Sequence, residues 1–242
     1  MSQTPQWLTQ DRLSFPPLGN ALTDPDGLLA VGGDLSPQRI IKAYSLGIFP
    51  WFNDDQPILW WSPSSRAIIP TDKLKINRTL QKFLRKTDYR LSVNCAFDEV
   101  IQYCANAPFR SEDTWITDEM SAAYENLHRA GYAHSIEVWQ EQTLIGGLYG
   151  IAIGGYFSGE SMFYKKDNAS KLALIAITSL LTSAGIHFID CQIENPFLNA
   201  MGCKVVSREQ FITMKDHAMA TTLPHSFWQS RFLDLSNLMD NM

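Results

Sequence analysis

Apolar and polar positions follow two different periods along the chain, and the period changes several times between residues 36 and 193. Spacing by three and four residues predicts helices, whereas strict alternation predicts strands with one buried face. Ser36 and Asn77 are good helix N-caps, and Gly47 is a typical helix stop. The predicted helices cover residues 36–47, 77–87, 97–106, 118–131 and 168–185, and the predicted strands cover 134–139, 143–153, 156–163 and 187–193, with an extended stretch at 89–94.

The order of these elements predicts an α+β fold. Three successive antiparallel strands, the last two joined by the turn Gly154-Gly155, are followed by a buried helix and a final strand. This order is similar to that of the N-acetyltransferases, so we expect a GNAT-type domain with a mixed, mainly antiparallel sheet. Prolines and serines cluster at residues 62–70. They predict a boundary between a small N-terminal domain, residues 1–64, and the larger domain, residues 65–242.

Acidic and amide side chains lie on strands that otherwise read as core. Alternation places Asp190 and Gln192 on the same face of the last strand, about 7 Å apart. On the strand before the buried helix, alternation places Glu160 and Met162 on one face. A buried charge needs a partner or a function. Glu160 alone is equally well explained as a buried, hydrogen-bonded structural residue, but acids on two strands of one sheet favour a shared polar site.

Composition narrows the class of protein. The chain of 242 residues is 45% hydrophobic and 19% charged, as in ordinary soluble globular proteins. Its net charge of −5 attracts neither nucleic acid nor an anionic membrane, so any such partner needs a local basic patch. Neither a signal peptide nor a membrane-spanning run is recognisable. The four cysteines and five histidines show no metal-ligand spacing, so we expect a reduced, cytoplasmic protein without a metal site.

One short helix provides such a basic patch. On a helical wheel its cations fall within an arc of about 100°, opposite the apolar side chains. A solvated face is the usual explanation of a charge run. Against it, no acidic residue lies between Asn77 and Thr87, and the chain as a whole is acidic. A phosphate-bearing partner explains such a face better. The face comprises Arg78, Lys82, Arg85 and Lys86, extended by Lys73, Lys75 and Arg90.

The segment before the buried helix lacks a glycine-rich phosphate cradle. An acetyl-CoA enzyme of this architecture normally has one there, whereas this chain has YKKDNASKLAL. An acetyl-CoA-dependent N-acyltransferase is therefore the alternative rather than the first prediction. A non-catalytic module that binds a phosphate-bearing partner is a third possibility, which the basic helix favours and the strand acids do not. No cofactor is expected.

A series of short motifs runs through nearly the whole chain in a recognisable order. They are GLLAVGGDLSP, AYSLGIFPWF, PILWWSP, TWIT, YAHSIEVW, GGLYG, GESMF, NASK and IDCQ. In these motifs the chain resembles the bacterial leucyl/phenylalanyl-tRNA–protein transferases. The resemblance implies transfer of Leu or Phe, and less readily Met, from aminoacyl-tRNA to the α-amine of proteins that begin with Arg or Lys. The product is a degradation signal of the N-end rule pathway.

The resemblance also assigns roles to residues at matching motif positions. It implies that Asp190 and Gln192 of IDCQ and Glu160 of GESMF serve reaction and acceptor binding, and that the basic face binds tRNA. Aromatic residues near the aminoacyl-adenosine end match Trp51 and Trp115, which by themselves are most often core or domain-docking residues. For the donor side chain we expect an apolar pocket lined by Leu148, Phe157, Met162 and Ile189.

Overall fold

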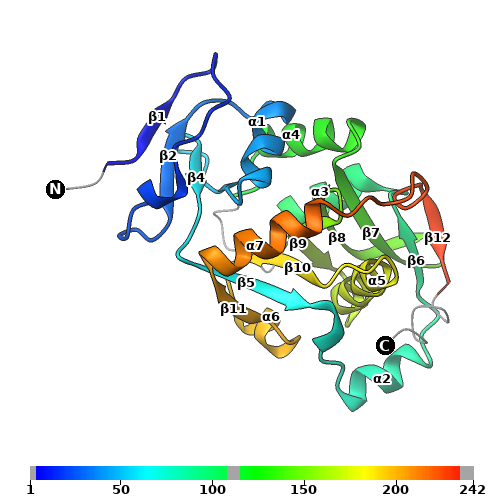
Figure 1. Ribbon diagram of the computed structural model, residues 1–242. Coiled ribbons are helices and arrows are strands. Elements are labelled where there is room, and N and C mark those ends of the chain that lie inside the picture. Colours follow the sequence, from blue (N-terminus) through cyan, green and yellow to red (C-terminus); the bar gives the residue numbers. More distant parts are fainter. Residues whose placement is uncertain (1–3, 108–114, 235–242) are drawn as a thin grey trace.

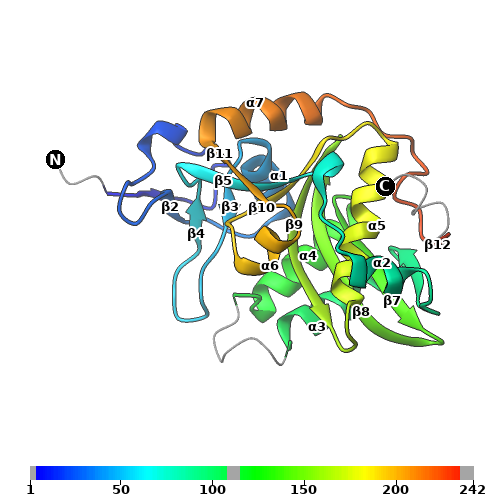
Figure 2. The same ribbon diagram turned by 90° about the horizontal axis from the view of Figure 1, so that it is seen from below.

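Residues 4–107 and 115–234, which the computed structural model describes, form a small and a large β-sheet with helices packed around them (Figures 1 and 2). The small sheet is four-stranded, with the order β1-β2-β4-β3. Its strands are β1 (Gln6–Leu8), β2 (Leu28–Gly32), β3 (Phe49–Pro50) and β4 (Leu59–Trp61). Helix α1 (Pro37–Ser45) lies between β2 and β3 in the chain, and the Ser36 side chain caps it as predicted.

The large sheet is eight-stranded, with the order β11-β5-β10-β9-β8-β7-β6-β12. All neighbouring strands are antiparallel except β9 and β10, so the sheet is mixed and mainly antiparallel, as predicted. The strands are β5 (Ser65–Pro70), β6 (Arg90–Val93), β7 (Ala133–Gln140), β8 (Thr143–Ile153), β9 (Tyr156–Tyr164), β10 (Phe188–Gln192), β11 (Lys204–Ser207) and β12 (Arg231–Leu233).

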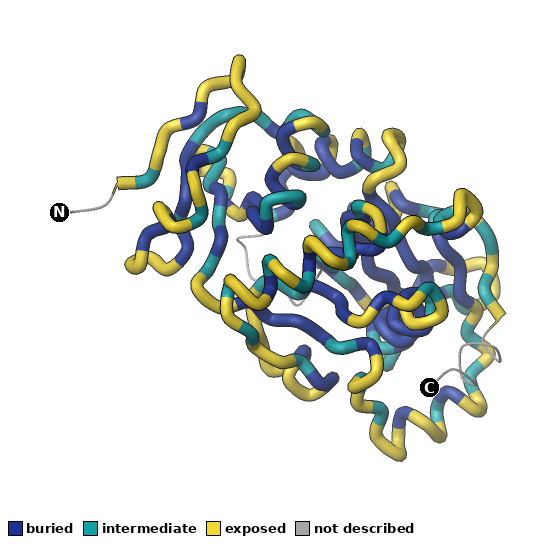
Figure 3. The backbone as a smooth tube through the Cα atoms, in the orientation of Figure 1, coloured by how far each residue is buried: buried dark blue, intermediate teal, exposed yellow. Residues whose placement is uncertain are grey.

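Helices cover both faces of the large sheet. They are α2 (Arg78–Leu84), α3 (Phe97–Ala105), α4 (Asp118–Arg129), α5 (Ala169–Ser183), α6 (Pro196–Ala200) and α7 (Arg208–Met219), with 3-10 turns η1 (Leu18–Asn20) and η2 (Thr71–Lys73). One hydrophobic cluster contains α3, α4 and residues of α1 and the small sheet, and a second contains α5 with Leu80 and Leu84 of α2. Helix α5 and the central strands are buried almost throughout (Figure 3).

The predicted α+β class and the predicted helices and strands are confirmed, with shifts at their ends. The helix expected over residues 77–87 ends at Leu84, and Asn168 adopts a left-handed conformation (φ 65°) without capping α5 by its side chain. Strand β4 ends just before the predicted domain boundary and β5 begins just after it. The division into domains 1–64 and 65–242 stays a prediction, because one hydrophobic cluster contains residues of both sheets.

Two of the bulges in the large sheet change the predicted alternation at candidate site residues. Between β8 and β9 the partners are Tyr149 with Ser161 and Gly150 with Gly159, which leaves Glu160 as an extra residue. The bulge turns Met162 toward the α5 cluster, whereas Glu160 faces α4. The prediction that these two side chains share a face is therefore wrong.

The second bulge lies in β10, beside β5. Cys191 is the extra residue there, and Gln192 takes a left-handed conformation (φ 56°). Regular alternation through Gln192, as predicted, is thus also wrong. Strands β9 and β10 pair at Ser158 and Asp190. Glu160 and Gln192, two residues further along each strand, line cavities.

Candidate active site

Asp190 lies at the centre of a closed polar cluster with no exposed surface. The Arg66 guanidinium on β5 donates two hydrogen bonds to its carboxylate, Nε to Oδ1 at 2.8 Å and Nη2 to Oδ2 at 2.7 Å. Hydroxyls of Tyr156 (2.5 Å) and Ser158 (3.2 Å) also donate to Oδ2. Burial lowers the pKa of Arg66, but the adjacent Asp190 carboxylate outweighs it and raises this pKa above its usual value. The Arg66 guanidinium therefore stays protonated.

The same carboxylate fixes the next polar residue of the strand. The backbone N–H of Gln192 donates to Asp190 Oδ1 at 3.0 Å, which stabilises the left-handed conformation of Gln192. The Gln192 side-chain amide then donates to Ser158 Oγ at 2.6 Å and to Glu160 Oε1 at 3.2 Å. Asp190 and Gln192 are thus brought together, but through the backbone of Gln192 rather than side chain to side chain.

Glu160 has a different environment. It belongs to β9, is half-buried and faces α4. The Tyr124 hydroxyl donates to its Oε2 at 2.9 Å, and the Tyr44 hydroxyl lies 2.9 Å from that of Tyr124. Tyr44 belongs to α1 and Tyr124 to α4, and both are fully buried. The carboxylate has no cationic partner among the described residues.

This setting brings the pKa of Glu160 close to neutrality. Burial, the largest influence, raises it, and the nearby Asp190 carboxylate raises it further. Hydrogen bonds from Tyr44 and Tyr124 lower it, and the net result is a pKa of about 7. A carboxyl group with such a pKa exchanges a proton readily at neutral pH, as a general base must.

An apolar cavity of about 400 Å³ opens beside Glu160 and Gln192. All the side chains predicted to hold the donor side chain line it: Leu148, Phe157, Met162 and Ile189. Helices α5 and α6 complete its wall through Leu174, Ile177 and Leu198. Its lining is mostly hydrocarbon, and Glu160, Gln192, Ser161 and Asn195 are among its polar residues.

A second cavity, of about 320 Å³, is also lined by Glu160 and Gln192. Trp51 and Trp115 line it, together with the exposed Ile193 and Glu194. Trp51 is 43% exposed and packs against Trp61 with the two rings tilted at 59°, and Trp61 donates its Nε1–H to the Trp51 carbonyl. Glu160 and Gln192 therefore form a wall shared by an apolar cavity and an aromatic one.

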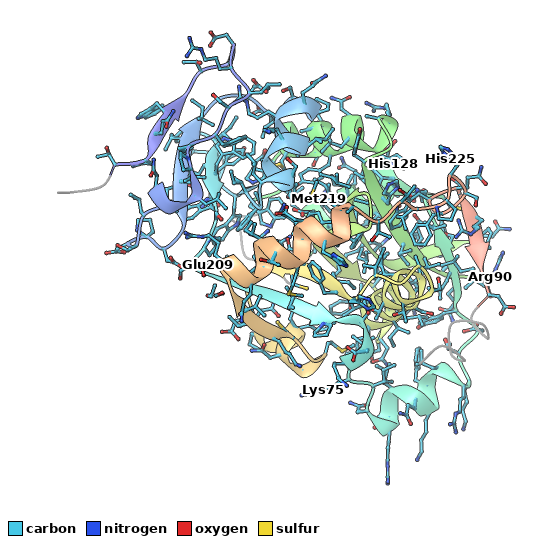
Figure 4. All side chains as sticks on the ribbon, viewed as in Figure 1. Lys75, Arg90, His128, Glu209, Met219 and His225 are labelled. Carbon is cyan, nitrogen blue, oxygen red and sulfur yellow. The ribbon has the colours of Figure 1, made fainter. Side chains whose placement is uncertain are left out.

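The predicted basic face lies outside both cavities, on α2 and the turn that follows it. Arg78, Lys82, Arg85 and Lys86 are all exposed, and none forms an ion pair within the part of the chain that the structure describes. Leu80 and Leu84 are buried on the opposite side of the helix. Side chains of α2 extend away from the body of the molecule, with Lys75 and Arg90 on either side of the helix (Figure 4).

Several residues of the site were not predicted from the sequence. They are Arg66, Tyr156, Ser158, Tyr44 and Tyr124. Arg66 lies 124 positions from its partner Asp190, so no local pattern connects them. For Tyr44 the one available signal was its place in the motif AYSLGIFPWF, directly before the stretch that holds Trp51.

Neither a metal centre nor a membrane helix is found among residues 4–107 and 115–234. No group of three or more His, Cys, Asp or Glu side chains there is placed to hold a metal ion. No helix of that part combines the length and the apolar character that crossing a bilayer requires.

Comparison with known proteins gives matches over most of the chain. The family described as leucyl/phenylalanyl-tRNA protein transferase matches residues 68–216, and the N-terminal domain of the same family matches residues 33–64. A protein of that name from Colwellia psychrerythraea is 56% identical over 238 residues, 96% of this chain and 99% of its own. One from Shewanella piezotolerans is 51% identical over 211 residues, 87% of this chain and 89% of its own.

Among solved structures the likeness is distant. The structure titled "The structure of L-PGS from Bacillus licheniformis" has a TM-score of 0.37 and 12% sequence identity. The match covers 64% of this chain and 50% of that one.

Proposed function

The chain belongs to the leucyl/phenylalanyl-tRNA–protein transferase family, and from that premise we propose that it transfers Leu or Phe, and Met less readily, from aminoacyl-tRNA to an acceptor protein. The acceptor is the α-amine of a protein that begins with Arg or Lys, and the new peptide bond turns that protein into an N-end rule substrate. The reaction belongs to the cytoplasm, and the larger domain has N-acetyltransferase-like topology in this proposal.

One observation carries the proposal: Glu160 and Gln192 form the wall between an apolar and an aromatic cavity. A donor that joins an apolar side chain to an adenosine requires two such compartments with its ester between them. The donor side chain occupies the cavity of Leu148, Phe157, Met162 and Ile189, and the adenosine stacks near Trp51 and Trp115. The ester carbonyl then lies beside Glu160 and Gln192.

The proposed reaction is aminolysis of an ester that tRNA charging has already activated, so it needs neither ATP nor a metal. The α-amine of the acceptor has a pKa of about 7.7–8.0, and part of it is neutral at cellular pH. It attacks the carbonyl carbon, the bond to the 3′-oxygen of adenosine breaks, and that oxygen leaves with a proton. Much of the acceleration comes from positioning the two reactants.

We assign Glu160 as the group that accepts a proton from the attacking amine. Its pKa of about 7 lies close to that of the amine, so proton transfer is nearly balanced. Its negative charge, when ionised, also attracts the cationic N-terminus of the acceptor. Gln192 holds the amine, and Asp190 orients Gln192. Because Asp190 is ion-paired with Arg66 and accepts from two hydroxyls, we assign it to positioning rather than to proton relay.

The apolar cavity accounts for the proposed donor range. Apolar pockets discriminate by only about 1–3 kcal/mol per methylene, so one cavity accepts Leu, Phe and some Met. Side chains branched at Cβ are widest next to the ester, beside Glu160 and Gln192, so we expect the site to reject them by shape. The tRNA body is held by the phosphate contacts of Arg78, Lys82, Arg85 and Lys86.

Transfer of labelled leucine from leucyl-tRNA to a peptide that begins with Arg tests the proposal, with a peptide that begins with Ala as control. We expect label on the Arg peptide and little on the Ala peptide. Absence of label on both peptides would contradict the proposal, and equal label would contradict the acceptor preference. Calorimetry with coenzyme A distinguishes this function from that of an acetyl-CoA-dependent N-acyltransferase. We expect no binding of coenzyme A, whereas the alternative requires it.

A further inference from the structure

A polar cavity of about 540 Å³ lies between the basic helix α2 and the central helix α5, apart from the two cavities of the active site. Its size falls within the range of about 300–1,000 Å³ that is typical of ligand sites. It is lined by Thr71, Asp72, Leu74, Ile76, Gln81, Leu84, Arg85, Thr178, Ser179 and Thr182.

Hydroxyl groups line the α5 side of this cavity, where apolar side chains would pack α2 more closely. Thr178 donates its hydroxyl hydrogen to the Leu174 carbonyl at 2.7 Å, and Thr182 donates to the Thr178 carbonyl at 2.8 Å. Both oxygens are therefore left as acceptors. The hydroxyl of Ser179 is buried and has no hydrogen-bond partner within the described residues. An unpaired buried hydroxyl calls for a partner from outside the chain.

The α2 side supplies an amide and a positive charge. Gln81 donates to the Ile76 carbonyl at 3.2 Å, which leaves its side-chain oxygen as a further acceptor. Arg85, one of the cations of the basic face, lines the same cavity and is exposed. A ligand with a phosphate outside and a hydrogen-bonding base inside matches this combination.

The cavity is also close to the proposed donor site. Ile177 of α5 lines the apolar cavity of the active site, and the next residue, Thr178, lines this one. The cavity thus has residues in common with the basic face, through Arg85, and borders the α5 residues that line the donor site. Proteins recognise RNA sequence mostly through unpaired nucleotides whose bases are splayed out and hydrogen-bonded.

We infer that the cavity between α2 and α5 receives one unpaired nucleotide of the donor tRNA, with its phosphate on Arg85 and its base among the hydroxyls. The inference rests on the proposed function. Because the lining presents mainly acceptors, the base is one with an exocyclic amino group, such as cytosine or adenine. The site adds shape and base recognition to the phosphate contacts of the basic face.

Filling the cavity with Gln81→Trp tests this assignment, and Thr79→Trp is the matched control. Thr79 is exposed on the same helix and does not line the cavity. Neither substitution changes the charge, so the salt dependence of tRNA binding should stay as in the wild type. We expect Gln81→Trp to raise the Kd for phenylalanyl-tRNA about tenfold or more, as for loss of one base contact. Thr79→Trp should bind as the wild type does.

Two further readouts complete the test. Reaction with phenylalanyl-adenosine, which is too short to reach the cavity, should be the same for the wild type and Gln81→Trp. In tRNA bound to the wild type, one unpaired cytosine or adenine should be protected from methylation by dimethyl sulfate. In tRNA bound to Gln81→Trp, the same base should be methylated. Unchanged or tighter tRNA binding by Gln81→Trp would overturn the inference. Failure of the wild type to transfer from any charged tRNA would instead overturn the proposed function.

Discussion

Asp190 and Glu160 lie on neighbouring strands of one sheet, yet the structure gives them opposite environments. Asp190 is fully buried, bound twice by Arg66 and hydrogen-bonded by Tyr156 and Ser158. Glu160 has no cationic partner within the described residues, lines two cavities and has a pKa of about 7. A carboxylate saturated by partners maintains geometry, whereas a carboxylate short of partners can exchange a proton. The comparison therefore separates positioning from proton transfer within one site.

Removing the proton acceptor should have the largest effect on the reaction. We expect Glu160→Gln to lower kcat/KM for transfer about 100- to 10,000-fold, the usual contribution of a general base. The Gln side chain can still accept from the Gln192 amide through its oxygen and can donate its NH2 to the Tyr124 hydroxyl, but it cannot take a proton. Initial rates with phenylalanyl-tRNA and a peptide that begins with Arg measure the loss.

Two controls sharpen this prediction. Glu119→Gln, an exposed position on α4, should keep wild-type rates. The folded pKa of Glu160 is raised above its unfolded value, so its ionisation lowers the free energy of unfolding as pH rises through about 7. Glu160→Gln should therefore be at least as stable as the wild type at about pH 8. A less stable variant would mean that the lost activity reflects folding.

Breaking the ion pair of Arg66 with Asp190 should mainly lower the stability of the fold. Asp190→Ala leaves the Arg66 guanidinium buried without a counter-charge, and we expect the free energy of unfolding to fall by about 3–5 kcal/mol. Denaturant titration measures this loss. Transfer and tRNA binding should then fall together as the folded fraction falls.

The double variant Arg66→Met, Asp190→Asn tests whether the charge of Asp190 takes part in the reaction. It removes both charges but keeps an acceptor for the Gln192 backbone N–H, so it should recover much of the lost stability. Transfer should be within about tenfold of the wild type, because a positioning residue acts through geometry. A stable but inactive double variant would return Asp190 to proton transfer.

The different environments of Asp190 and Glu160 could only partly be predicted from the sequence. Alternation identified Asp190, Gln192 and Glu160 as polar positions on core strands, and four of the residues that line the apolar cavity were also predicted from the sequence. The difference between the two acids depends on contacts distant in sequence, such as Arg66 with Asp190 and Tyr124 with Glu160. The bulges at Glu160 and Cys191 are set by strand pairing, so a rule of strict alternation misplaces Met162.

The basic face is assigned to binding tRNA and neither acid is, so reversing its charges should weaken tRNA binding without changing the rate of the chemical step. We expect Arg78→Glu with Lys82→Glu to raise the KM for tRNA about tenfold or more and to lower the salt slope by about one per lost phosphate contact. Kinetics over a range of salt concentrations measure both. Arg12→Glu with Lys204→Glu changes the net charge equally on exposed positions elsewhere. An equal effect of this control pair would refute the assignment to α2.

The smallest effect is expected at the wall of the apolar cavity. Leu148→Met preserves most of the side-chain volume, so the ratio of kcat/KM for Leu and Phe donors should change by about tenfold or less. Parallel assays with leucyl- and phenylalanyl-tRNA give this ratio. Leu127→Met, buried in the other hydrophobic cluster, should leave it unchanged. An equal change in both variants would contradict a local role of Leu148.

Titration of the carboxyl carbons of glutamate-labelled protein by ¹³C NMR tests the central claim most directly. We expect one glutamate resonance with a midpoint at about pH 7, which is missing from Glu160→Gln and retained in the double variant Arg66→Met, Asp190→Asn. If every glutamate of the wild type titrated at about pH 4–5, the usual range, Glu160 could not be the proton acceptor proposed here.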